Sequence, residues 1–297
     1  METGKACGKL ILLGEHAVVH GSPALVSGID RRLCASAEAA DESLLKLLDR
    51  ECDDAAEPLA RAFGALLDVE PKLAARVEVR GELPPGVGLG FSAAAGVAIA
   101  RAVEGLAGDV DENRVAERAT AWEKVFHGNP SGVDVAAAQH GGCIRFSRAE
   151  GISKVALAQP LNLVVGLSGE PSSTKGMVEG VARLKDDNPQ LVEANIGAIR
   201  ALVENAISAA EDGQHPALGE LMNLNQMLLA GLMVSSEILE SMCATAREAG
   251  ALGAKLTGAG GGGAVVALVD DGASGQRVLK AWRDAGFEGF ATRVGHD

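Results

Sequence analysis

Hydrophobic and polar positions change their period several times along the first third of the chain, and each change predicts an element. Short apolar runs over 9–14, 22–30 and 32–39 end at glycine or at charged residues and indicate strands. Residues 42–70 place leucines at helical spacing among charged side chains, which predicts helix. Residues 74–83 alternate apolar and polar side chains, as a half-exposed strand does.

The middle of the chain predicts helices built from small residues. An alanine-rich stretch over 92–107 indicates one helix, and residues 110–126 indicate a second, with Asp111 as a suitable N-cap. The polar turn "HGNPSGVD" follows, and we expect a further helix to begin near Ser131 or Asp134.

The second half alternates short strands with long helical stretches. Strands are expected over 141–146 and 161–169, with a turn at 149–154, and residues 254–271 predict strand, glycine loop and strand. Because the elements do not repeat as βαβ units, an α+β fold is favoured over a doubly wound sheet. We expect a domain boundary near 150–160. The predicted helices cover 174–186, 189–212, 216–230, 235–249 and 274–285, and a short strand over 289–294 closes the chain.

Composition narrows the class of protein. The 297 residues are 47% hydrophobic, which excludes a disordered chain, and aromatic residues make up only 3%, so the core must be mainly aliphatic. A formal net charge of −13 repels a phosphate backbone, so we expect no nucleic-acid partner. No apolar run reaches the roughly 18 residues of a membrane span, and we expect neither a signal peptide nor a membrane partner. Five widely spaced cysteines without a C-x-x-C pair predict free thiols and a cytoplasmic location.

The stretch "PPGVGLGFSAAAG" indicates a ligand site. Gly86, Gly88 and Gly90 alternate before a helix that begins near Ser92. Glycine permits positive φ and leaves no Cβ in the way, and free N–H groups at a helix N-terminus favour an anion such as phosphate. A serine at the helix start can also place its hydroxyl on a magnesium ion.

Several interpretations of this loop compete. A P-loop requires a lysine that this stretch lacks. Gly88, Gly90 and Ala93 fit the dinucleotide pattern G-x-G-x-x-A, but two prolines precede the glycines and no acid ends a second strand about 20 residues later. A different ATP loop, held by backbone and helix dipole, fits better. A glycine-rich turn that only allows a helix to pack closely also remains open.

Three further stretches carry candidate chemistry. "GKLILLGEHAVVHG" places Lys9 before a strand and Glu15 and His16 after it, although Lys9 could also be a solvated surface charge. His16 and His20 are four residues apart, but Ala17 stands where a zincin needs glutamate, so a metal pair is disfavoured.

The other two stretches lie later in the chain. In "HGNPSGVD", Asp134 would stand in the positive field of a helix start and stay ionised, or it would be only a cap. In "KLTGAGGGGAVVAL", four consecutive glycines could bring bare backbone against a substrate, or form a flexible hairpin.

Taken together, these motifs resemble those of the GHMP kinase superfamily and, within it, the mevalonate kinase family. The resemblance spans nearly the whole chain, in the family's order and spacing. It implies an α+β, two-domain GHMP kinase fold, with an N-terminal ribosomal-protein-S5-like domain over 1–157 and a C-terminal ferredoxin-like α/β sandwich domain over 158–297. It also implies an enzyme of isoprenoid precursor synthesis that phosphorylates the 5-hydroxyl of mevalonate with ATP and Mg²⁺.

The resemblance assigns a role to each matching residue. Asp134 would accept the proton of the hydroxyl, Lys9 would pair with Asp134, and Ser92 and Glu123 would bind magnesium. Arg145 would meet the mevalonate carboxylate, for which a bidentate guanidinium is suited. The further substrate candidates are Glu15, His16, Thr174, Gly258 and Gly260. The phosphates of ATP would meet Gly86, Val87, Gly88, Leu89, Gly90, Phe91, Ser92 and Ala93.

Two residues depart from the family pattern. Cys7 replaces a proline before Lys9, and we expect little effect on chemistry. Phe91 replaces a serine beside Ser92. Its side chain could point away from the phosphates, because backbone N–H groups make the main contacts, or it could cover the nucleotide or pack in the domain interface. The resemblance also allows a homodimer. The alternatives are a GHMP kinase for phosphomevalonate or a sugar, a related decarboxylase, a non-catalytic nucleotide-binding protein and a Rossmann dehydrogenase.

Overall fold

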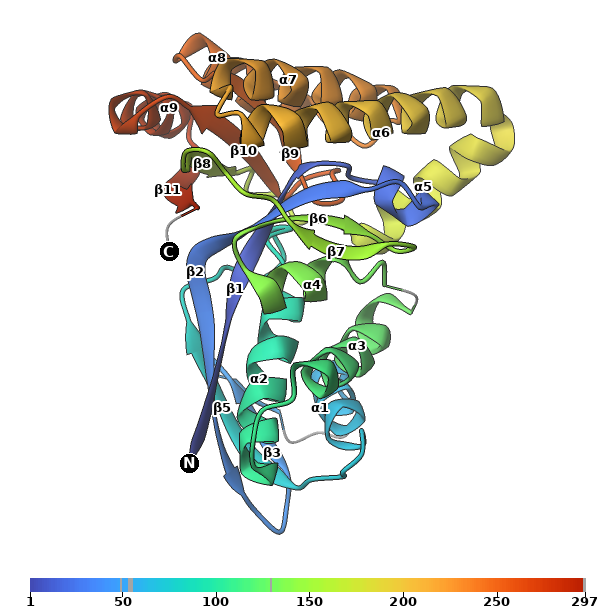
Figure 1. Ribbon diagram of the computed structural model, residues 1–297, viewed down its shortest axis with the longest axis vertical. Helices are drawn as coiled ribbons and strands as arrows, with labels where there is room; N and C mark the ends of the chain where they lie inside the picture. Colours follow the sequence, from blue (N-terminus) through green and yellow to red (C-terminus); the bar gives the residue numbers. More distant parts are fainter. Residues whose placement is uncertain (49, 53–55, 129, 296–297) are drawn as a thin grey trace. The chain divides into compact units, whose positions relative to one another are not determined.

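A computed structural model describes residues 1–48, 50–52, 56–128 and 130–295 (Figure 1). The chain divides into two compact units that are interleaved along the sequence. One unit contains residues 1–9, 31–84 and 90–141, and the other contains residues 10–30, 85–89 and 142–297. Two long strands, β1 (Glu2–Leu13) and β2 (Ala24–Ala39), contribute to both units. The predicted division into consecutive domains at 157/158 stays a prediction.

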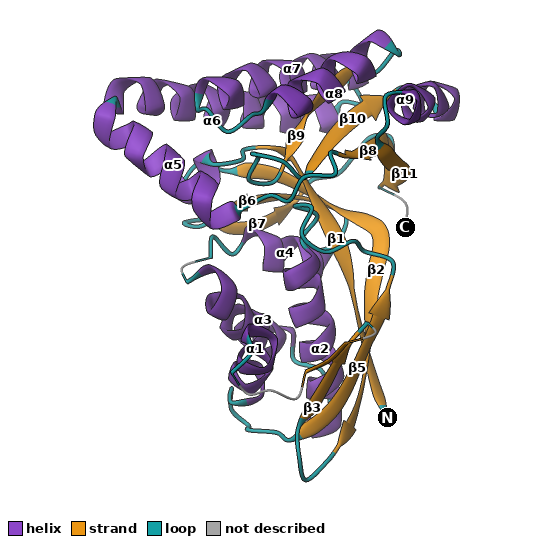
Figure 2. Ribbon diagram, turned by 180° about the vertical axis from the view of Figure 1, so that it is seen from behind, coloured by secondary structure: helices purple, strands orange, loops and turns teal. Residues whose placement is uncertain are grey.

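The first unit packs helices on one face of a mixed sheet (Figures 1 and 2). The later part of β2 pairs antiparallel with β5 (Ala75–Gly81), which pairs parallel with β3 (Leu44–Leu47). Strand β4 (Arg50–Cys52) completes this side of the sheet. The helices of this unit are α1 (Pro58–Leu67), α2 (Phe91–Ala107), α3 (Glu112–His127) and α4 (Val133–His140).

The alanine-rich sequence of α2 has a direct structural use. Gly4 of β1 lies so close to this helix that a Cβ there would stand 2.1 Å from the carbonyl oxygen of Ala98. On another side of α2, a buried ion pair ties it to α3, because Arg118 Nε donates to Glu104 Oε1 at 2.5 Å. Arg118 also donates to the carbonyl oxygen of Leu66 at the end of α1. These hydrogen bonds compensate the buried guanidinium of Arg118, whose desolvation would otherwise destabilise the fold.

The second unit is built around an antiparallel sheet in the order β11-β8-β10-β9, with α7, α8 and α9 packed on it. The early part of β2 pairs with β6 (Cys143–Ser147), which pairs with β7 (Gly151–Lys154). The remaining strands are β8 (Leu161–Leu167), β9 (Gly253–Thr257), β10 (Ala264–Val269) and β11 (Glu288–Val294). The helices are η1 (Ala17–His20), α5 (Thr174–Asp187), α6 (Pro189–Glu211), α7 (His215–Gly231), α8 (Glu237–Glu248) and α9 (Gly272–Asp284).

The structure confirms most predicted elements and corrects three. The helix expected over 42–70 is wrong in its first part, where strand pairing overrides the leucine spacing: β3 pairs with β5, and β4 pairs with β3. The two strands expected over 22–39 are one continuous strand, β2. The turn expected over 149–154 ends early, since residues 151–154 pair with β6. Within the described residues, no helix has the length and apolarity needed to cross a membrane.

Candidate active site

The first group of candidate residues lies in the first unit, where Lys9 meets Asp134. Lys9 lies on β1 and is only 3% exposed, and its Nζ stands 2.9 Å from Oδ1 of Asp134. Asp134 occupies the first turn of α4, so its carboxylate faces both an ammonium and the positive end of a helix. The Asp134 side chain remains 37% exposed, which leaves it accessible to a bound molecule.

A second contact in the same unit joins Ser92 to Glu123. Ser92 stands in the first turn of α2 and donates from Oγ to Oε1 of Glu123 at 2.5 Å. Trp122, the residue before Glu123 on α3, donates from Nε1 to Oγ of Ser92 at 3.1 Å. One turn further along α3, His127 Nε2 lies 3.6 Å from Oε2 of Glu123.

The two contacts form one electrostatic group. Burial raises the pKa of Glu123 to about 7, and the hydrogen bond from Ser92 opposes this shift. The charge of Asp134 raises the same pKa further, whereas the charge of Lys9 lowers it. The candidates Lys9, Ser92, Glu123 and Asp134 are therefore close enough to influence one another. A buried carboxylate with so high a pKa lacks full compensation for its charge.

This donor set fits a divalent cation with a preference for oxygen. Mg²⁺ binds through one or two carboxylates together with hydroxyl, water and phosphate oxygens. Ser92 offers a hydroxyl and Glu123 a buried carboxylate that a cation would stabilise in its ionised form. The oxygen chemistry and the raised pKa of Glu123 thus agree with the magnesium role expected for these two residues.

The glycine loop uses its glycines for backbone conformation. Gly86, Gly88 and Gly90 have φ values of 77°, 80° and 73°, a region that other residues rarely adopt. Gly90 is the N-cap of α2, and the half-buried Phe91 is the first residue of that helix. The free N–H groups of the first turn of α2 follow Gly90 directly, and such groups at a helix N-terminus can bind an anion.

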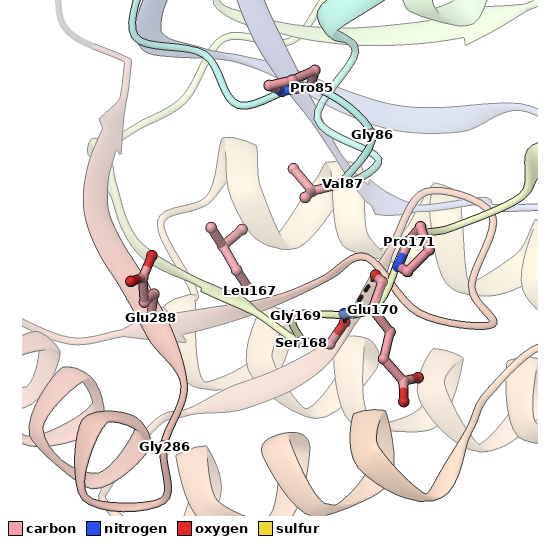
Figure 3. A pocket seen from close by; sticks show the side chains of 10 residues that line it. All are labelled: Pro85, Gly86, Val87, Leu167, Ser168, Gly169, Glu170, Pro171, Gly286 and Glu288. Atoms are coloured by element: carbon pink, nitrogen blue, oxygen red, sulfur yellow. Dashed lines mark hydrogen bonds between the residues drawn. The ribbon is translucent and has the colours of Figure 1, made fainter.

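The first residues of the loop also line a cavity of about 380 Å³ within the second unit (Figure 3). The side chains of Val87 and Leu167 point into this space, and its wall includes the backbone at Gly86. The cavity shows that there is open space beside the first residues of the loop. Leu89 and Ala93 are both buried.

Glu15 and His16 lie in the second unit, directly after β1. Glu15 is fully buried and forms an ion pair with the equally buried Lys255 of β9. Nε2 of His16 donates to the carbonyl oxygen of Ala259 at 2.8 Å, and burial lowers the pKa of His16. His16 has φ +60°, a strained backbone conformation for a residue other than glycine, and its ring contacts the glycine motif at 258–263.

That glycine motif packs tightly within the second unit. A Cβ at Gly258 would stand 3.2 Å from the carbonyl oxygen of Gly88, and one at Gly260 would stand 2.0 Å from that of Val234. Ser172 fixes the motif further, because its Oγ donates to the Gly260 carbonyl oxygen at 2.8 Å. The glycines therefore allow close backbone approach in the loop that joins the antiparallel strands β9 and β10.

Two substrate candidates lie in settings that leave their roles as predictions. The guanidinium of Arg145 on β6 binds Glu150 at 2.5 Å and Glu204 at 2.9 Å, so two carboxylates of the protein already occupy it. Thr174 is exposed at the start of α5, and the preceding Ser173 caps that helix. Asn129 of "HGNPSGVD" lies outside the described residues.

Sequence reasoning missed two residues that contact the candidates. Lys255 is the one charged residue of strand β9, which was the available signal for a buried partner. Trp122 is one of only two tryptophans and directly precedes Glu123. The structure brings Lys9 to Asp134, and Ser92 to Glu123, within one unit; Glu15 and His16 belong to the other unit.

Comparison with known families places these motifs in context. Residues 51–142 match the family described as GHMP kinases N terminal domain, and residues 206–288 match GHMP kinases C terminal. The mevalonate kinase of Pyrococcus abyssi is 33% identical over 96% of this chain and 93% of its own length. The mevalonate kinase of Aeropyrum pernix is 34% identical over 98% of this chain and 95% of its own.

Solved structures give the same comparison in three dimensions. The crystal structure of L. major mevalonate kinase in complex with R-mevalonate superposes with a TM-score of 0.87. It is 31% identical to this chain, and the match covers 99% of this chain and 96% of that one. Sequence and fold similarity therefore extend over both units.

Proposed function

Since the chain belongs to the GHMP kinase family, among the mevalonate kinases, we propose that it phosphorylates the 5-hydroxyl of mevalonate with ATP. The products are 5-phosphomevalonate and ADP, and the reaction belongs to isoprenoid precursor synthesis. The observation that carries this proposal is the buried Lys9 ammonium 2.9 Å from Asp134, in one group with Ser92 and Glu123.

In the proposed reaction, the 5-oxygen of mevalonate attacks the γ-phosphorus and the bond from that phosphorus to the β,γ-bridging oxygen breaks. The hydroxyl proton passes to a carboxylate oxygen of Asp134, and the leaving ADP carries the bond electrons. Lys9 orients Asp134. Its ammonium also stabilises the negative charge that moves from the 5-oxygen of mevalonate to the leaving oxygen of ADP. Phosphoryl transfer depends mainly on positioning and electrostatics, so the protein needs few side chains that take part in the chemical step itself.

Ser92 and Glu123 would hold Mg²⁺, which neutralises phosphate charge when bound. The backbone of the glycine loop, from Gly86 to Ala93, would contact the phosphates. The proposed contacts to mevalonate are Glu15, His16, Thr174, Gly258, Gly260 and Arg145. For Arg145, this role requires that the guanidinium exchange Glu204 for the substrate carboxylate.

A cytoplasmic location is also part of the proposal. It rests on five widely spaced cysteines without a C-x-x-C pair, the pattern expected of thiols in a reducing compartment.

Release of ADP tests the function directly. The purified protein is incubated with MgATP and, separately, mevalonate, 5-phosphomevalonate, galactose or homoserine. We expect turnover with mevalonate alone. Turnover with another acceptor and none with mevalonate would reject the proposed substrate and favour a different GHMP kinase.

The role of Asp134 is tested by Asp134→Asn, which keeps the shape but cannot accept the proton. We expect the rate to fall by about 10²- to 10⁴-fold. The matched control is Asp111→Asn, also an aspartate at a helix start in this unit, where asparagine caps equally well. Near-normal turnover by Asp134→Asn would remove Asp134 from the mechanism.

A further inference from the structure

The indole of Trp122 donates to a side chain, whereas that of the other tryptophan, Trp282, donates to backbone. Trp122 and Trp282 are both buried, and both donate from Nε1. Trp282 donates to the backbone carbonyl oxygen of Met242 at 2.9 Å, which only satisfies its polar group. Trp122 instead donates to the hydroxyl of Ser92, a side chain of the candidate active site.

This contact determines how the Ser92 hydroxyl can be used. A serine hydroxyl has one donor and two acceptor positions, and an indole N–H can only donate. Oγ of Ser92 therefore accepts from Trp122 with one lone pair and gives its proton to Glu123. A single lone pair remains for a third partner, and its direction is fixed by the first two.

The surroundings hold the indole in place. Gly96 lies one turn after Ser92 on α2, and a Cβ there would stand 2.8 Å from Cδ1 of Trp122. The Phe126 ring packs against the indole with centroids 5.5 Å apart. Trp122 and Glu123 are consecutive on α3, so one helical turn supplies both contacts to Ser92.

We propose that Trp122 is a positioning residue that directs the free lone pair of Ser92 toward the divalent cation of the bound nucleotide. The proposal rests on the proposed function, since it takes Ser92 as a ligand of that cation. A tryptophan that served only to fill the core would not require its N–H to meet this hydroxyl. Removing the N–H should then weaken the binding of the metal–nucleotide complex to the protein and leave the binding of metal-free nucleotide unchanged.

The test measures ADP binding by titration calorimetry, with and without Mg²⁺. For Trp122→Phe, we expect the dissociation constant of Mg·ADP to rise about fivefold, the effect of one lost hydrogen bond. The constant for metal-free ADP should change by less than about twofold. Trp282→Phe is the matched control, because it removes an indole and a buried hydrogen bond from the other unit, and we expect neither constant to change.

Equal weakening of both forms of ADP, or no weakening of either, would leave Trp122 as a core residue and overturn the proposal. If Trp122→Phe does not fold, benzothienylalanine at position 122 replaces the N–H by sulfur and keeps the ring shape. A Mg²⁺-dependent difference in a protein that does not phosphorylate mevalonate would support Trp122 and reject the proposed substrate. Absence of Mg·ADP binding by the unsubstituted protein would overturn both.

Discussion

Gly90, at the start of α2, offers a sharp test of the Lys9–Asp134 pair. Its φ is +73°, and a Cβ there would stand 2.7 Å from Cγ of Lys9. Ordinary contact begins at 3.4 Å, so Gly90→Ala must push the lysine stem by about 0.7 Å. Cγ is the second carbon of the lysine side chain, so displacing it also displaces the atoms beyond it, up to Nζ.

The effect on the pair follows from Coulomb's law. If Nζ withdraws from 2.9 Å to about 3.6 Å, the attraction falls by about 1 kcal/mol at an effective dielectric constant of about 20. Asp134 is more than one-third exposed, so solvent screening reduces this figure. We expect kcat to fall about threefold from the charge alone, and up to about tenfold when misalignment is added.

A stability control separates this effect from backbone strain. Gly151 has φ +79° and open space where its Cβ would lie. Both alanine variants should lose about 1–2 kcal/mol of folding free energy from left-handed strain, whereas only Gly90→Ala should lose kcat. The assays are urea unfolding and ADP release. Equal kcat values for the two variants would refute the reasoning that Gly90 is required by the stem of Lys9.

Three further predictions concern single side chains. If Arg145 meets the mevalonate carboxylate, Arg145→Ala raises the KM for mevalonate more than that for ATP, whereas equal increases would reject this role. Burial lowers the pKa of His16 from 6.5, so the unfolded state binds more protons below pH 6.5 and stability falls there; urea unfolding of His16→Asn should show a weaker pH dependence. Burial raises the pKa of Cys143 to about 12, so at pH 8 a maleimide should label exposed Cys34 first, as peptide mass spectrometry would show; early labelling of Cys143 would contradict its burial.

Much of the fold could be predicted because helix periodicity is local. The hydrogen bonds of a helix join residues four apart, so a window of sequence contains the whole pattern. The helix predicted over 42–70 failed in its first part because a strand depends on partners elsewhere. Leu45 lies opposite Val77, and no local window contains that pairing. The glycine motifs could be located from sequence for a related reason, since positive φ is a property of a single residue.

By itself, the sequence determined which residue types were available for the chemistry and where most helices begin and end. Only the tertiary structure decided which side chains meet. Lys9 contacts Asp134 from a distant part of the chain. Trp122 donates its N–H to the Ser92 hydroxyl, whereas Trp282 donates to a backbone carbonyl oxygen. The physical reason is that such contacts depend on how helices and strands pack, and a glycine such as Gly96 acts by permitting a close approach that its own neighbours in sequence do not reveal.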